Sequence, residues 1–195
     1  MPRTGSDTSG ALPGWAAPQL ADAKFKNSHG ACSPFMLTRP LITHLRKHFA
    51  LDWQGIHGAP HWARVRANGL RLAETTGAHQ AVVELFAFLH DSCRLDEYED
   101  PGHGERAAGL ARDLRDRFFA LPDAEFSWLV AACEGHSDGF TDAAHVTILT
   151  CWDADRLDLG RIGIRPKATK LCTSAARDPG VIEWAYQRSR RGGRY

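Results

Sequence analysis

Apolar residues fall three or four positions apart along most of the chain after residue 40. In the first such segment, Leu41, Leu45 and Phe49 share one face of a helix. The same spacing continues, and helix follows helix with only short turns between them. The fold class is therefore predicted to be all-α. Helices are expected from about residue 40 to 49 and at 60–76, 79–91, 105–119, 124–135, 142–159 and 181–190.

Glycine and proline residues mark the ends of several of these helices. Pro60 suits a first helical turn, where no N–H is needed, and Gly77 suits a helix end. Residues 161–180 contain two prolines and two glycines and are predicted to form a loop. Residues 1–36 are rich in Gly, Pro, Ser and Ala without a sustained period, which indicates a flexible N-terminal segment. The predicted divisions are that segment, a helical domain over 37–176, and a C-terminal helix with a basic tail over 177–195.

The composition excludes several classes of protein. A length of 195 residues suits one domain, and 43% hydrophobic with 24% charged residues is typical of a globular chain. Lys plus Arg number 24 and Asp plus Glu 23, so the net charge of +1 gives no reason to expect a nucleic-acid partner. The basic run at 188–194 is interpreted as a solvated end. No apolar run approaches the roughly 18 residues that cross a membrane, so no membrane partner is expected.

The cysteines and the N-terminus bear on the compartment. The five cysteines form no CxxC pair, which argues against a disulfide framework and against a zinc ribbon. Reduced thiols fit this pattern best. The first residues lead into no apolar core of a secretion signal. A cytoplasmic location is therefore expected.

Ten histidines are the unusual feature of the composition. His57 and His61 are four residues apart and would share a helical face. His90 and Asp91 end a very apolar helix, where an unpaired buried polar group costs roughly 1–3 kcal/mol and where a metal ion would satisfy both. Imidazole and carboxylate groups suit iron, manganese, zinc, nickel or cobalt. Further candidate ligands stand on later helices or at their ends: His103, His136, Asp153 and Asp155.

The order of these residues resembles that of a known family. A single histidine, His61, is followed by the dipeptide His90-Asp91 and then by a distant aspartate in the run Asp153-Ala154-Asp155-Arg156-Leu157-Asp158. This order is similar to the signature of the HD superfamily of metal-dependent phosphohydrolases. The resemblance covers about residues 55–165 and implies a single HD-domain helical bundle, here over 37–176, with a loose N-terminal tail.

The resemblance also implies metal ligands. His61, His90, Asp91 and Asp155 would bind the metal, with Asp155 matching the family's Ala-Asp-x-Leu pattern. Two helical residues that are two positions apart do not face the same way. Asp153 is therefore expected to point elsewhere.

Dinuclear branches of the family add two histidines between the His-Asp pair and the last aspartate. His103 and His136 lie in these intervals and would hold a second divalent ion, with Asp91 shared between the two ions. The first ion would then be bound by His61, His90 and Asp155. A mononuclear site is the alternative, with His103 capping a helix and His136 meeting a helix dipole.

The resemblance predicts hydrolysis of a small phosphorylated metabolite or nucleotide. Bound metal lowers the pKa of water toward about 7, and arginine binds phosphate through two parallel hydrogen bonds. Arg94 follows Asp91 by three residues, where several relatives place a phosphate-contacting lysine, and Glu105 is a candidate general base. Each of two candidates has an alternative interpretation that involves no substrate. Arg94 is equally suited to a salt bridge with the acidic loop 96–100, and His57 is equally suited to a position on the surface. The candidate substrate-binding residues are His57, Arg94, Arg106 and Arg156.

Two other functions fit the same residues. Some dinuclear members of the superfamily are di-iron oxygenases, which would use the same six ligands. A non-catalytic nucleotide-binding module with structural metal is the third hypothesis. The chain has no Gly-Tyr-Pro triplet after the His-Asp pair, so the cyclic-dinucleotide branch of the family is not indicated.

Overall fold

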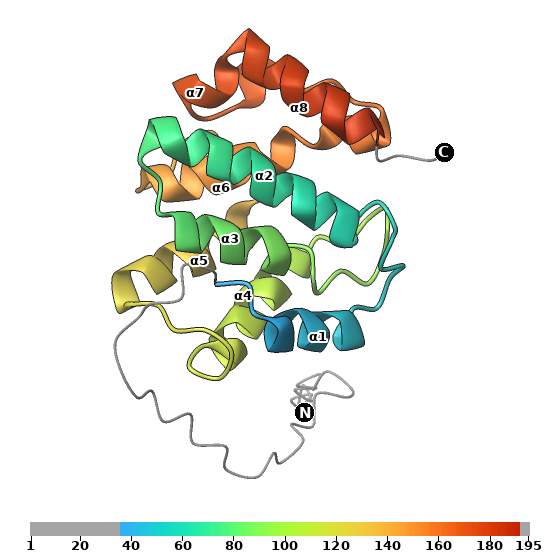
Figure 1. Ribbon diagram of the computed structural model, residues 1–195, viewed down its shortest axis with the longest axis vertical. Coiled ribbons are helices and arrows are strands. Elements are labelled where there is room, and N and C mark those ends of the chain that lie inside the picture. The colour runs from blue at the N-terminus through green and yellow to red at the C-terminus, as the bar shows by residue number, and fades with distance from the viewer. Residues whose placement is uncertain (1–35, 192–195) are drawn as a thin grey trace, which may run out of the picture. The chain divides into compact units, whose positions relative to one another are not determined.

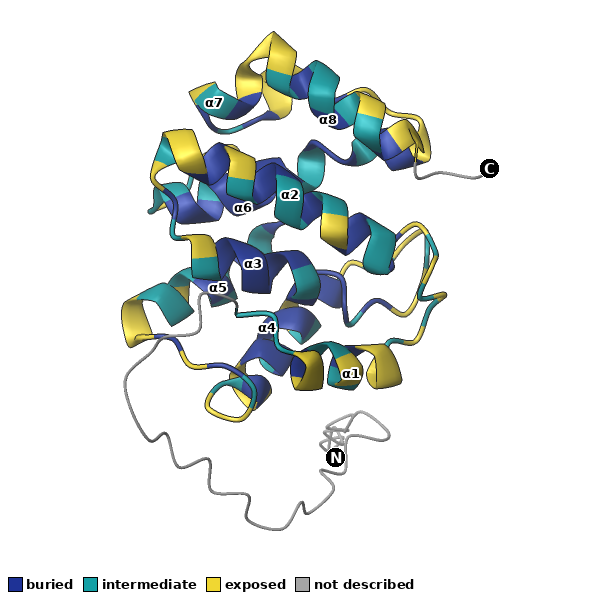
Figure 2. Ribbon diagram, in the orientation of Figure 1, coloured by how far each residue is buried: buried dark blue, intermediate teal, exposed yellow. Residues whose placement is uncertain are grey.

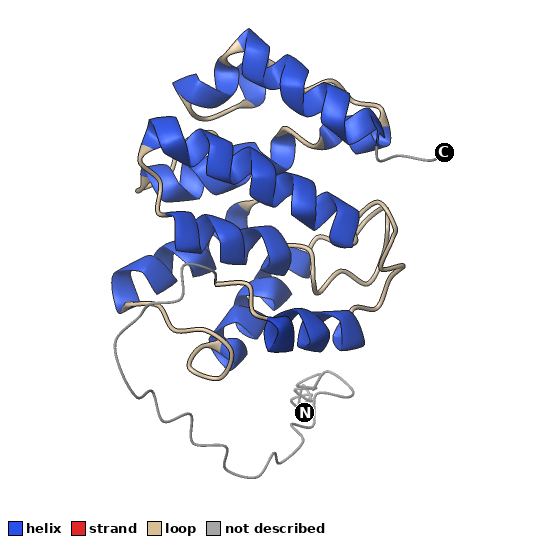
Figure 3. Cartoon of the chain, viewed as in Figure 1, coloured by secondary structure: helices blue, strands red, loops and turns tan. Residues whose placement is uncertain are grey.

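Helices form the regular structure of the computed structural model, which describes residues 36–191 (Figures 1 and 3). No strand occurs within that range, so the all-α prediction is confirmed. The predicted flexible segment 1–36 lies outside the described residues except for Met36. The elements are α1 (Arg39–His48), α2 (Ala59–Thr76), α3 (Gln80–Leu89), α4 (His103–Leu114), α5 (Asp123–Gly135), α6 (Val146–Arg156), the 3-10 helices η1 (Leu159–Ile162) and η2 (Ala168–Lys170), α7 (Ser174–Arg177) and α8 (Pro179–Arg191).

The core surrounds α3, which packs against α2, α4, α5 and α6. Most of its side chains are buried, and Figure 2 shows the middle of this helix in the buried colour. A helix that is apolar on all sides is stable only when neighbours cover it completely. Its C-terminal end therefore delivers His90 and Asp91 to the interior of the bundle.

Glycines let the helices around α3 approach closely. A Cβ at Gly104 of α4 would lie 2.6 Å from the carbonyl oxygen of Cys133 and 2.8 Å from that of Glu134, both on α5. A Cβ at Gly69 of α2 would collide with Val83 of α3. The lack of a side chain at Gly104 therefore allows the N-terminal end of α4 to lie against the C-terminal end of α5, and Gly69 does the same for α2 and α3.

Two predicted helices were wrong in extent. The helix expected at 105–119 begins at His103 and ends at Leu114, because Asp116 adopts a positive φ of 62° and its N–H donates to the carbonyl of Phe119 at 2.7 Å. The helix expected at 142–159 spans only Val146–Arg156. Its first residue is Val146 and not residue 142, because the Nδ1 of His145 accepts a hydrogen bond from the Thr147 N–H at 3.2 Å and caps the helix there.

The segment 161–180, predicted as a loop, contains the rest of η1 and all of η2 and α7. Asp153 of α6 holds this segment by accepting hydrogen bonds from Cys172 N at 2.6 Å and from Thr173 N and Oγ1, both at 2.8 Å. The C-terminal helix α8 packs on η1, α7 and α2. No helix in residues 36–191 is long and apolar enough to cross a membrane.

Candidate metal centre

Four buried histidines meet in the middle of the bundle. They stand at helix ends: His61 in the first turns of α2, His90 directly after α3, His103 at the start of α4 and His136 directly after α5. Their Nε2 atoms converge in two pairs. The Nε2 atoms of His61 and His90 are 3.1 Å apart, and those of His103 and His136 are 2.8 Å apart.

The opposite nitrogen of each ring donates a hydrogen bond. Because a carbonyl or carboxylate accepts only, each Nδ1 carries the proton, and each neutral ring presents a lone pair at Nε2. Two facing lone pairs repel unless a cation or a proton lies between or beside them. Metal-ligating histidines are held in this way. The Nδ1 acceptors are Asp158 Oδ2 at 2.7 Å for His61, Phe86 O at 3.1 Å for His90, Asp100 O for His103 and Cys133 O at 2.7 Å for His136.

Asp91 lies between the two histidine pairs, and each of its oxygens faces one pair. Oδ2 is 3.4 Å from His61 Nε2 and 3.6 Å from His90 Nε2. Oδ1 is 3.4 Å from His103 Nε2 and 3.6 Å from His136 Nε2. Burial opposes ionisation of Asp91, but attraction to His90, His136 and His61 in their protonated forms holds its pKa well below the usual range, and Asp91 in turn raises the pKa of His136 despite burial.

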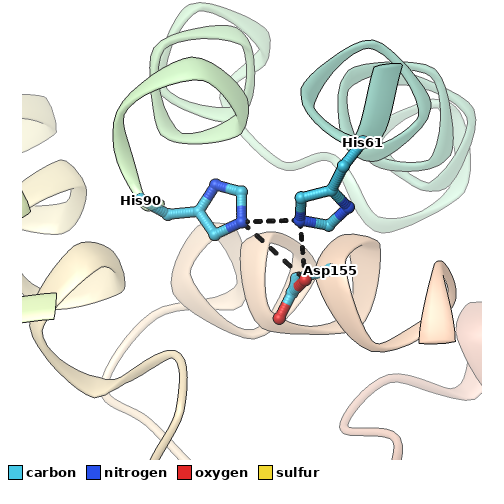
Figure 4. A group of neighbouring side chains, drawn as sticks. All are labelled: His61, His90 and Asp155. Atoms are coloured by element: carbon cyan, nitrogen blue, oxygen red, sulfur yellow. Dashed lines mark hydrogen bonds and ion pairs between the residues drawn. The ribbon is translucent and has the colours of Figure 1, made fainter. Parts of the chain in front are cut away.

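Asp155 completes one side of the cluster. Its Oδ1 is 3.4 Å from His61 Nε2 and 3.7 Å from His90 Nε2, and Figure 4 shows the three side chains facing one another. This oxygen is buried and accepts no hydrogen bond. Burial alone would raise the pKa of Asp155, yet His90 and Arg161 lower it. An ionised, buried oxygen without a donor is the atom that a metal ion would satisfy.

Two groups of potential ligand atoms are therefore close enough to hold an ion: those of His61, His90 and Asp155, and those of His90, Asp91 and His136. The structure brings all six predicted metal ligands into one cluster. As predicted, Asp153 points elsewhere and binds the segment before α7.

Asp158 supports the cluster and was missed from the sequence. It accepts from His61 Nδ1, and Arg64 holds it through Nε at 2.6 Å and NH2 at 3.0 Å. These donors keep the pKa of Asp158 low although burial raises it. The available signal was its place three residues after Asp155, on the same side of a helical turn.

Arg94 and His57 lie beside the cluster, as their candidate roles require. Both are buried. Arg94 NH1 is 3.4 Å from His103 Nε2 and 3.7 Å from Asp91 Oδ1. The His57 ring centroid is 6.3 Å from that of His61, and its Nδ1 donates to Glu97 at 2.6 Å.

The other three candidates make different contacts. Glu105 is exposed on α4. Arg106 donates to Asp100 Oδ1 at 2.6 Å and to the carbonyl of Cys93. Arg156 donates to the carbonyl of Lys170 at 3.1 Å and contacts Cys172 Sγ at 3.2 Å. The guanidinium groups of Arg106 and Arg156 thus hold loops in place. The structure does not bring Glu105, Arg106 or Arg156 against the six candidate ligands.

Arg161 is a second arginine at the cluster and was not singled out from the sequence. It is buried, its NH1 lies 3.9 Å from Asp155 Oδ1, and its Nε donates to the carbonyl of Ile56 at 3.0 Å. It falls in the stretch that was predicted to be a loop. No sequence period pointed to it, because it reaches the cluster from a 3-10 turn.

No family model, curated protein or solved structure matches this chain. The geometry of the cluster is therefore the basis for assigning a function.

Proposed function

We propose that this protein is a metal-dependent phosphohydrolase with a dinuclear centre, of the HD type, acting on a small phosphorylated metabolite or nucleotide. The observation that carries the proposal is the placement of Asp91. Its two oxygens face two separate pairs of histidine Nε2 atoms at 3.4 to 3.6 Å. A carboxylate that bridges two ions has this arrangement, whereas a mononuclear site needs only one of the pairs.

The donor set suits two divalent ions. His61, His90, Asp155 and one oxygen of Asp91 would hold the first, and His103, His136 and the other oxygen would hold the second. Nitrogen and oxygen ligands favour iron, manganese, cobalt, nickel or zinc over calcium or magnesium. When bound, such ions lower the pKa of coordinated water toward about 7 and polarise a phosphoryl oxygen.

Arg94 has the features of a phosphate-binding residue. Its Nε donates to the carbonyl of Asp96 at 3.2 Å and its NH2 to that of Tyr98 at 3.5 Å, which leaves NH1 directed at the cluster. This fixed guanidinium would donate to a non-bridging oxygen of the phosphate. A charged donor in a buried site binds phosphate more strongly than one in water.

His57 would handle a proton. Its Nδ1 donates to Glu97, so its Nε2 is an acceptor in the neutral ring. Burial lowers the pKa of His57. The charge of Asp91 raises this pKa, and the charges of Arg161 and Arg94 lower it. In the hydrolysis, a water oxygen bonds to phosphorus, the ester P–O bond breaks, and the leaving oxygen takes a proton. A neutral His57 can accept the proton that the water loses and return one to the leaving group.

The two buried arginines favour phosphate chemistry over the oxygenase hypothesis. Arg94 lies against the His103 side of the cluster and Arg161 against the Asp155 side. Each arginine lies near a carboxylate, Arg94 near Asp91 and Arg161 near Asp155, and together they would offer an anionic substrate two guanidinium groups beside the ions. In hydrolysis these arginines would bind the group that reacts, whereas in an oxygenase they would bind a part of the substrate that does not react.

The test combines metal analysis with a turnover assay. Purified protein, Asp91→Ala and the control Asp153→Asn are analysed by mass spectrometry for metals and incubated with a panel of phosphomonoesters and nucleotides. We expect about two ions per chain in the wild type and the control, loss of both in Asp91→Ala, and phosphate release that follows metal content. Absence of metal after supplementation would overturn the proposal. Iron with oxygen consumption and no phosphate release would support the oxygenase, and nucleotide binding without turnover would support the binding module.

A further inference from the structure

Three loops meet in front of the cluster, and each carries one buried side chain toward it. The loop between α1 and α2 carries His57, the loop between α3 and α4 carries Arg94, and the turn after α6 carries Arg161. The first two are joined by the hydrogen bond from His57 to Glu97 at 2.6 Å. The first and third are joined by the bond from Arg161 to the carbonyl of Ile56 at 3.0 Å. The three loops are therefore joined to one another, and we call them together the mouth.

Exposed apolar side chains gather on the same three loops. Within residues 36–191, six large hydrophobic residues are exposed, and five of them belong to these loops, the sixth being Phe140. We call the five the apolar rim. Their exposed fractions are 39% for Ile56, 64% for Leu95, 89% for Tyr98, 40% for Ile162 and 50% for Ile164.

The rim and the buried polar residues alternate along the chain. Ile56 precedes His57, Leu95 follows Arg94, and Ile162 follows Arg161. In each pair one side chain is turned inward to the cluster and its neighbour is turned to solvent. Exposed apolar residues next to buried polar residues are a feature of ligand-binding surfaces.

The charge around the mouth narrows the class of ligand. The loop between α3 and α4 also carries Asp96, Glu97 and Glu99, of which Asp96 and Glu99 are exposed. These carboxylates would repel a chain of phosphates that extended outward from the cluster. A single phosphate held at the arginines would be shielded from them, and an uncharged body outside would not be repelled.

Resting on the proposed function, we infer that the substrate is an amphiphilic phosphomonoester. Its one phosphate group would lie against the cluster, Arg94 and Arg161, and its alkyl or aryl body would lie on the apolar rim. A nucleoside triphosphate fits this mouth poorly because its charge extends into the acidic loop.

The test uses alkylphosphonates, which carry the same dianionic head and cannot be hydrolysed at an ester bond. Binding of methyl-, butyl- and octylphosphonate to the metal-loaded full chain is measured by calorimetry, with adenosine triphosphate as the polyanionic comparison. Complete burial of one methylene strengthens binding by about fourfold. On a partly open rim we expect about twofold per methylene, which gives roughly 100-fold tighter binding of octyl- than of methylphosphonate.

A matched pair of variants assigns the effect to the rim. Leu95→Ser with Ile162→Ser should lower the octyl-to-methyl affinity ratio by about tenfold, because two apolar contacts are lost. Phe140→Ser removes an exposed aromatic residue outside the three loops and should leave the ratio unchanged. All three substitutions are at exposed positions, where folding is usually preserved.

The outcomes separate this inference from the proposed function. A ratio that rises with chain length and falls in the rim variant supports the inference. Binding of methylphosphonate with no dependence on chain length would overturn it while leaving phosphohydrolysis in place. Failure of every phosphonate to bind a metal-filled protein would count against both. A flat series together with a dimer that the rim variant dissociates would assign the rim to a second copy of the chain and would also overturn the inference.

Discussion

The two halves of the cluster use the same kinds of ligand but are supported differently. In the first half, formed by His61, His90 and Asp155, the ring of His61 is held by the carboxylate of Asp158, which Arg64 holds in turn. In the second half, formed by His103 and His136, both Nδ1 atoms donate to main-chain carbonyls. A carboxylate partner makes an imidazole a stronger ligand than a carbonyl does.

The neighbouring charges increase this difference. The first half contains the extra carboxylate of Asp155, which offsets the charge of Arg161 3.9 Å away, whereas Arg94 lies 3.4 Å from the Nε2 of His103 in the second half, which has no carboxylate of its own. A cation beside a ligand opposes the binding of a metal ion. The first half should therefore hold its ion tightly and act as the fixed part of the centre. The second half should bind more weakly and leave more positions for water and substrate.

The largest expected effect comes from removing one histidine from each half. His61→Ala should lower the affinity for the first ion by more than about 100-fold and should abolish turnover. Loss of a residue that only supports a ligand costs up to about 100-fold, and loss of the ligand itself should cost more. His103→Ala should release the second ion and keep the first. Metal content after dialysis against a chelator checks both variants. Equal loss from the two variants would contradict the difference between the halves.

The next effect comes from the support of the first half. Asp158→Asn should lower the affinity for the first ion by about 10- to 100-fold, because the carboxylate that orients His61 is lost. Asp153→Asn is the matched control on the preceding turn. It should cost about 1–3 kcal/mol of stability, because Asp153 accepts three hydrogen bonds from Cys172 and Thr173, but it should leave metal affinity unchanged. Chelator competition and thermal unfolding separate the two results.

A smaller effect on metal binding should follow from moving the two histidines of the second half apart. Gly104→Ala places a methyl group against the carbonyls of Cys133 and Glu134, so α4 must move away from α5 and His103 from His136. Overpacking of this kind costs about 1–3 kcal/mol. Gly109→Ala, on the same helix with open space around it, should be neutral or stabilising by about 0.5–1 kcal/mol. Loss of the second ion in Gly104→Ala alone would support the close approach of the two helices.

The smallest effect concerns pH. The pKa of His136 is raised above the ordinary 6.5 by Asp91, whereas burial lowers the pKa of His90 in the first half. Because a metal binds only the neutral ring, protons compete earlier in the second half as the pH falls. The affinity of the second position should begin to weaken above pH 6.5 as the pH falls, and should decrease by up to about tenfold per pH unit. Equilibrium dialysis across this range checks the order, and release of the first ion at the higher pH would contradict it.

Much of the fold could be predicted because the apolar period is strong. The cores of the longer helices and the order of His61, His90, Asp91 and Asp155 depend on local pattern and were accessible from the sequence. The end of α4 was not, because it depends on a left-handed Asp116. Asp158 and Arg161 were missed for another reason: their hydrogen bonds to His61 and to Ile56 join residues about a hundred positions apart, and the place of Asp158 three residues after Asp155 does not by itself reveal that partner.

The six proposed ligands stand on, or directly after, five different helices, α2 to α6. Bound ions would thus act as cross-links between segments that are far apart in the chain. An ion present at 1,000 times its dissociation constant stabilises the form that binds it by about 4.1 kcal/mol. Chains without metal would open more often and be cut sooner by proteases. The amount of intact protein in a cell would then follow the supply of the metal itself.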